Sequence, residues 1–182
     1  MYFAPNMYFH PHYANGGPFL NYGNAPYQGI DDMGQSYPLG RPTKDRLSRD
    51  HGNRPFVINI HKAASRNRTF RTAIWTGNHL QVTLMSIGVG EDIGLEMHPH
   101  VDQFLRIEQG QGIVQIGNTQ TNLSFVRRVF DDDAIFVPAG KWHNVINIGH
   151  TPLKLYSIYA PPEHPFGTVH VTKADAIAAE HS

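Results

Sequence analysis

The sequence predicts an all-β domain, a sandwich or closed barrel, preceded by an irregular arm. With 182 residues the chain is long enough for one domain and too short for two full enzymatic domains. Two observations carry the fold prediction: short apolar or alternating runs recur from Pro55 onward with turn residues between them, and helical patterning is confined to the C-terminal end.

Residues 1–50 differ in composition from the rest of the chain. Residues 1–30 contain no Lys, Arg, Asp or Glu, and six of the eight tyrosines lie at or before Tyr37. Gly, Pro and Asn recur every few positions, so neither helical nor strand periodicity persists. We therefore predict an irregular arm over 1–50 and a folded domain over 51–182. The tyrosines are expected to pack on a surface of this domain or of a second copy.

The domain is predicted to consist of short strands bounded by Gly, Pro, Asn or Asp. In order, the predicted strands span 56–60, 72–76, 80–87, 95–100, 104–108, 112–116, 124–130, 134–137, 144–148 and 153–159. A short helix closes the chain, because Thr172 and Asp175 form a capping box ahead of the Ala-rich run 174–179.

Composition argues against several classes of partner. Fifteen Lys and Arg balance fifteen Asp and Glu, so no net charge attracts the chain to nucleic acid. No run approaches the ~18 apolar residues of a membrane span, and the N-terminus lacks the pattern of a secretion signal. We expect neither nucleic-acid nor membrane partners, and a cytoplasmic location. There is no cysteine, whereas twelve histidines make imidazole the first candidate for chemistry.

Two histidine-containing segments predict a metal site. His98 and His100 are two residues apart, so on a strand both imidazoles face the same side of the sheet. The second segment, Pro138-Ala-Gly-Lys-Trp-His143, predicts a tight turn followed by a strand whose first inward residue is His143. Three neutral imidazoles suit a divalent transition metal and leave coordination positions open for water or substrate.

These segments resemble the two motifs of the cupin family. The first motif runs Gly, five residues, His-x-His, three or four residues, Glu, six residues, Gly. The second runs Gly, five residues, Pro-x-Gly, two residues, His, three residues, Asn. The matching residues here are His98, His100, Gln103 and Gly110 for the first motif, and Pro138, Gly140, His143 and Asn147 for the second. The resemblance, which extends to mannose-6-phosphate isomerase-like cupins, implies a double-stranded β-helix barrel of the jelly-roll type with a metal in its mouth.

By this resemblance the implied ligands are His98, His100, Gln103 and His143, and the metal is Mn, Fe, Zn or Ni. Gln103 stands where the family places a carboxylate, and its neutral amide oxygen is a weaker donor, so we expect lower affinity or no ligation at this position. Two further departures are present: only two residues separate His100 from Gln103, and the opening glycines of the motifs fall at Asp92 and Asp132. Both are turn positions, which Asp tolerates.

Two classes of function remain open. The resemblance implies a metal-dependent enzyme acting on a small oxygen-rich substrate, through sugar-phosphate isomerisation or dioxygenation. The alternative is a non-enzymatic cupin that forms a coat or surface-layer assembly, as a homodimer or larger oligomer joined by the arm. A fold alone does not choose between these classes.

Overall fold

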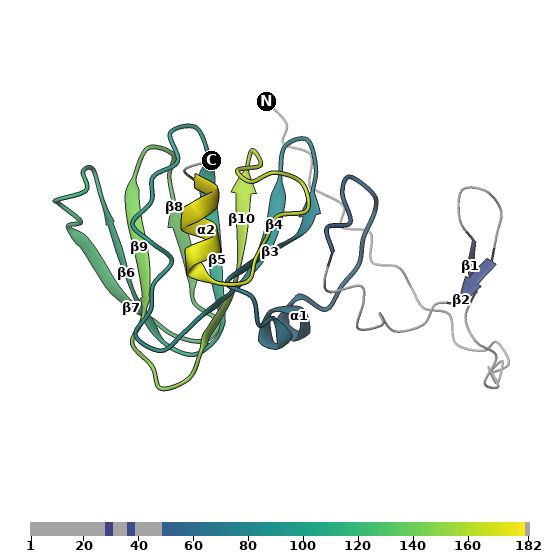
Figure 1. Ribbon diagram of the computed structural model, residues 1–182, viewed down its shortest axis with the longest axis horizontal. Helices are drawn as coiled ribbons and strands as arrows, with labels where there is room; N and C mark the ends of the chain where they lie inside the picture. Colours follow the sequence, from purple (N-terminus) through teal and green to yellow (C-terminus); the bar gives the residue numbers. More distant parts are fainter. Residues whose placement is uncertain (1–27, 31–35, 39–48, 181–182) are drawn as a thin grey trace, which may run out of the picture. The chain divides into compact units, whose positions relative to one another are not determined.

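The computed structural model describes residues 28–30, 36–38 and 49–180 (Figure 1). The chain divides into two units, Met1–Arg41 and Pro42–Ser182. In the first unit, strands β1 (Gln28–Ile30) and β2 (Ser36–Pro38) pair in antiparallel orientation. This hairpin lies within the range predicted to be irregular. Most of the arm falls outside the described residues, so its packing on a surface or a second copy remains a prediction.

The second unit contains two antiparallel sheets, which confirms the predicted all-β double-stranded β-helix. The larger sheet has the strand order β11-β3-β4-β10-β5-β8 and the smaller the order β7-β6-β9, and Figure 1 shows them as two groups of strands. The strands are β3 (Arg71–Thr76), β4 (Gln81–Ile87), β5 (Asp102–Gln109), β6 (Gly112–Gly117), β7 (Phe125–Val129), β8 (Ala134–Val137), β9 (Trp142–Asn147), β10 (Leu153–Ala160) and β11 (Val169–His170).

The inward side chains of the larger sheet change character along its strands. At one end, the register places Gln81 opposite Tyr159 and Tyr159 opposite Gln103, and all three are buried. Further along the same strands the paired inward residues are apolar and also buried: Met85, Leu155, Ile107, Ile87 and Leu153. The barrel therefore has a polar end and an apolar end, and the apolar end belongs to the main core.

Two predicted strands are wrong. Residues 56–59 are irregular and lead into helix α1 (Ile60–Arg66), whose N-cap Asn59 accepts a hydrogen bond from the Lys62 amide. Ala63 and Ala64 are buried on the side of α1 that packs against the sheet. Their spacing from Ile60 is helical, which was the available signal.

The predicted strand at 95–100 is also absent. Asp92 and Glu96 form isolated bridges to β9, and Pro99 and His100 lie in a turn. Proline lacks the N–H that a strand ladder requires, which ends the pairing at this point.

The C-terminal helix is confirmed as α2 (Lys173–Glu180). Its capping box is formed: the Thr172 amide donates to Asp175 Oδ2 at 2.8 Å, and the Asp175 amide donates to Thr172 Oγ1 at 3.3 Å. Lys173 Nζ lies 2.7 Å from Asp92 Oδ1, so the start of α2 is tied to the loop that precedes Glu96. None of the described helices is long and apolar enough to cross a membrane.

Candidate metal centre

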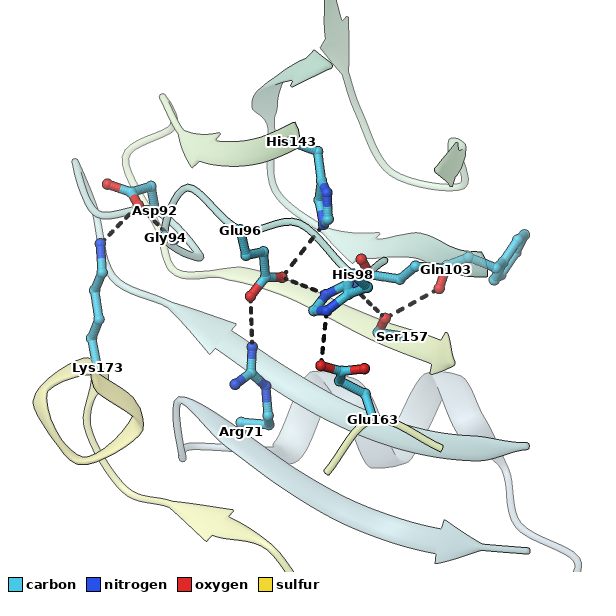
Figure 2. Close-up of polar contacts among 11 residues, drawn as sticks. Arg71, Asp92, Gly94, Glu96, His98, Gln103, His143, Ser157, Glu163 and Lys173 are labelled. Atoms are coloured by element: carbon cyan, nitrogen blue, oxygen red, sulfur yellow. Dashed lines mark hydrogen bonds and ion pairs between the residues drawn. The ribbon is translucent and has the colours of Figure 1, made fainter. Parts of the chain in front are cut away.

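Three potential metal-binding side chains converge inside the barrel: Glu96, His98 and His143 (Figure 2). Their ligand atoms all lie within 4.8 Å of one another. Glu96 Oε1 is 3.5 Å from His143 Nε2 and 3.7 Å from His98 Nε2. These separations are too long for ordinary hydrogen bonds. They are close to the ~3.0–3.4 Å between adjacent ligands that each lie ~2.1 Å from a shared ion.

Backbone pairing holds the two ligand-bearing segments together. The Glu96 amide donates to the His143 carbonyl at 3.1 Å, and the His143 amide donates to the Glu96 carbonyl at 2.9 Å. His98, two residues after Glu96, is held in the same way: its carbonyl accepts a hydrogen bond from the Gly140 amide at 2.8 Å. Directly paired residues project their side chains to the same face, which brings Glu96 and His143 together.

The second nitrogen of each imidazole has its own partner. His143 Nδ1 lies 3.0 Å from the Lys141 carbonyl, which can only accept, so this nitrogen carries the proton and Nε2 offers a lone pair. His98 Nδ1 lies 3.0 Å from Glu163 Oε1. Both rings thus turn Nε2 toward Glu96, the orientation that metal-ligating histidines show when a carbonyl or carboxylate holds the other nitrogen.

Four buried polar atoms at this end of the barrel have no hydrogen-bond partner among the described residues. They are Glu96 Oε1, His98 Nε2, His143 Nε2 and Gln103 Oε1. Gln103 donates its amide N–H to Ser157 Oγ at 3.0 Å, which leaves the amide oxygen unpaired. Buried polar groups are rarely left unsatisfied, and a cation satisfies acceptors of this kind. The donor set of two imidazoles, a carboxylate and an amide therefore fits a divalent transition metal.

The charges around the cluster shift two pKa values strongly. Burial alone would raise the pKa of Glu96, but His143, His98 and Arg71 outweigh it and hold this pKa far below the usual range. Burial alone would lower the pKa of His98, but the carboxylates of Glu163 and Glu96 raise it to about 9. Arg71 Nη2 lies 3.6 Å from Glu96 Oε2, so Glu96 has Arg71 on one oxygen and the histidines on the other.

The loop that follows β10 contributes to this site. Glu163 comes from this loop, and the next residue, His164, exchanges hydrogen bonds with the Gln81 side chain through its backbone N–H and carbonyl at 2.9 and 2.8 Å. The His164 ring meets Tyr159 edge-on at 5.0 Å between centroids. Burial, together with the charge of Arg71, lowers the pKa of His164 to about 3. Nothing in the local sequence indicates these partners of His164.

The structure brings together only some of the residues predicted as ligands. His98 and His143 meet in the cluster, and Gln103 is buried with its amide oxygen in the same interior. His100 is exposed in the turn after His98 and does not belong to the cluster. The prediction that His98 and His100 share a face assumed a strand, and the turn at Pro99 removes that alternation.

Sequence reasoning missed Glu96, although the motif spacing contains the signal. The spacing fits the first motif when Glu96 and His98 occupy its two His positions. Five residues then separate Gly90 from Glu96, four separate His98 from Gln103, and six separate Gln103 from Gly110. Both irregularities of the first motif disappear in this register. The opening positions Gly90 and Asp132 then share a left-handed backbone, with φ of 75° and 71°.

Residues 83–159 match the cupin domain family. The chain belongs to the cupin superfamily. It is similar to Uncharacterized protein YrkC of Bacillus subtilis (strain 168), with 58% identity over 185 residues that cover 96% of this cupin and all of the relative. The chain is also similar to the crystal structure of BH2720 from Bacillus halodurans, with 69% sequence identity and a TM-score of 0.71. The match covers 71% of this cupin and 98% of BH2720. Uncharacterized protein L612 of Acanthamoeba polyphaga mimivirus is 38% identical over 122 residues, covering 66% of this cupin and 74% of the relative.

Proposed function

We propose that this cupin binds a divalent transition metal through Glu96, His98 and His143, with the amide oxygen of Gln103 as a weaker fourth donor. The observation that carries this proposal is a set of four buried polar atoms that form no hydrogen bond with other described residues and lie at the four ligand positions of the cupin motifs. In this set Glu96 supplies the carboxylate that Gln103 lacks, and His100 has no part.

The metal would serve to bind a small oxygen-rich molecule at the polar end of the barrel. When bound, the ion acts as a Lewis acid toward such a ligand. Two histidines and one carboxylate are the set typical of non-haem iron oxygenases, which favours dioxygenase-like over sugar-phosphate isomerase-like chemistry. The side chains of Glu96 and Glu163 are 13% and 30% exposed, so the site is open to solvent at its rim.

Metal analysis of three variants tests the ligand set. Protein purified without added metal, and then loaded with Mn²⁺, Fe²⁺, Zn²⁺ or Ni²⁺, should hold about one ion per chain. Glu96→Ala and His143→Ala should abolish binding, because each removes a strong donor. His100→Ala is the matched control and should bind like the wild type. Loss of metal in His100→Ala with retention in Glu96→Ala would overturn the proposed ligand set.

Self-association is a second candidate role, favoured by exposed aromatic side chains beside a sheet edge. Phe136, on the edge strand β8, is 72% exposed, and Phe125 on β7 is 46% exposed. Both line the same groove. Exposed apolar groups beside the open edge of a sheet suit an interface with a second copy. Sedimentation should then show a smaller species for Phe136→Ser than for wild type, and an unchanged monomer for both proteins would reject the role.

A further inference from the structure

Two hydroxyl groups inside the barrel stand without a hydrogen-bond partner. Thr83 Oγ1 and the Tyr159 hydroxyl are buried, and both residues are 0% exposed. Neither atom forms a hydrogen bond of ordinary geometry with another described residue, although Ser157 interacts electrostatically with the Tyr159 hydroxyl. A buried hydroxyl that forms no hydrogen bond destabilises the folded protein, whereas Val and Phe would fill the same space without that cost. The two hydroxyls therefore point to a ligand that satisfies them.

Both hydroxyls belong to the polar end of the barrel, beside the candidate metal centre. The Tyr159 ring meets His98 edge-on at 5.7 Å between centroids and is paired across the strands with Gln103. Thr83 is paired with Ser157, the residue that accepts the Gln103 amide hydrogen bond. His164 Nε2, against the same tyrosine, is also buried without a partner among the described residues.

The charges at this end favour an anion once a metal is bound. The charged side chains that contact the cluster are Arg71, Glu96 and, at the rim, Glu163. With both histidines neutral as ligands, the charges of Arg71, Glu96, Glu163 and a divalent ion sum to +1. A net positive charge enclosed in a barrel is costly unless an anion neutralises it.

We propose that the metal-loaded cupin binds a small carboxylate anion at its polar end, with the hydroxyls of Tyr159 and Thr83 donating hydrogen bonds to the anion's oxygens. The inference rests on the proposed metal site and names the ligand class of that site. Arg71 contributes through its positive charge. A carboxylate supplies both the charge and the acceptor oxygens that this arrangement lacks.

Calorimetric titration of the Mn²⁺-loaded protein tests the ligand class. Glycolate and pyruvate are the carboxylate probes, and acetamide is the neutral probe of similar size. The carboxylates should bind at least about tenfold more tightly than acetamide. Tyr159→Phe and Thr83→Val should each weaken carboxylate binding by about tenfold with unchanged metal content, since each removes one hydrogen bond to a charged group. Tyr156→Phe, on the other face of the same strand, is the matched control and should bind like the wild type.

A second readout separates ligand recognition from a structural role. Metal-free Tyr159→Phe and Thr83→Val should melt at the same temperature as the wild type or higher, because an unsatisfied hydroxyl is lost. Equal binding of acetamide and carboxylates, or unchanged carboxylate affinity in both variants, would overturn the carboxylate site while the metal site stands. Failure of the wild type to retain metal would instead reject the proposed function on which this inference rests.

Discussion

Glu163 Oε1 lies 3.0 Å from Nδ1 of His98, so a residue of the loop after β10 holds the ring of a candidate metal ligand (Figure 2). Gln81 fixes that loop by hydrogen bonds to the backbone of His164, the next residue. The orientation of His98 therefore depends on a carboxylate that lies far from it in the sequence. This relationship has a direct consequence for the effect of pH.

Metal affinity should rise with pH up to about pH 9. Without metal the pKa of His98 is raised to about 9, against burial, by Glu163 and Glu96, and an incoming ion must displace that proton. Competition with a chelator between pH 6.5 and 8.5 should show affinity increasing by up to about tenfold per pH unit. Glu163→Gln lowers the pKa of His98, so its affinity should level off at a lower pH. An affinity independent of pH in the wild type would contradict this prediction.

The stability of the metal-free protein should depend on pH through two histidines in separate ranges. The pKa of His98 is higher in the folded state than the ordinary value near 6.5, so its contribution is complete below that pH and is lost as pH rises toward 9. The pKa of His164 is lowered to about 3, mainly by burial, so stability falls as pH drops below 6.5 because only the unfolded chain takes up the proton.

Urea denaturation at pH 7 and pH 5 measures the His164 effect. His164→Gln should remove up to roughly 2 kcal/mol of the stability difference between these pH values. His100→Gln, an exposed histidine, is the control and should behave like the wild type. An acid loss of the same size in His164→Gln and the wild type would show that other groups are responsible.

Gln103→Glu should tighten metal binding and destabilise the metal-free protein. A carboxylate at this position is a stronger donor than the amide, but without a cation it adds a buried negative charge close to Glu96. The melting temperature should therefore fall without metal and rise more steeply than in the wild type when metal is added. Unchanged affinity would place residue 103 outside the coordination sphere.

Asp132 occupies the opening glycine position of the second motif with φ of 71°. Asp132→Gly should leave stability within about 1 kcal/mol of the wild type, since glycine adopts this backbone conformation freely. The variant also loses the ion pair with Arg106, but the Asp132 side chain is exposed, so this pair contributes little. Asp132→Val should cost about 1–2 kcal/mol because a β-branched residue is strained there. Equal denaturation midpoints for the two variants would show that backbone conformation at this turn is unimportant.

The strands and the cupin barrel could be predicted because their signals are local. Alternation and turn residues mark β4 to β10, and the second motif locates His143 at the start of β9. The spacing from Gly90 to Gly110 also contains a motif register that includes Glu96, but His98 and His100, two residues apart, suggested a different register.

The remaining site residues could not be predicted because they come from distant parts of the chain. Arg71 lies on β3, Tyr159 on β10 and Glu163 in the loop beyond it, and only the folded sheets bring them near Glu96. Helix α1 was missed for a different reason: Ile58 and Ile60 alternate like strand residues, and the helical spacing from Ile60 to Ala64 is short.

The division of the barrel interior into a polar and an apolar end separates two tasks along the same strands. Met85, Ile107 and Leu155 pack the core, whereas Thr83, Gln103 and Tyr159, two to four positions along, face the site. Exchanges among the polar residues should therefore leave the apolar packing intact, so the interior of this end can change without rebuilding the scaffold. The same barrel is for this reason a suitable starting point for engineered binding sites.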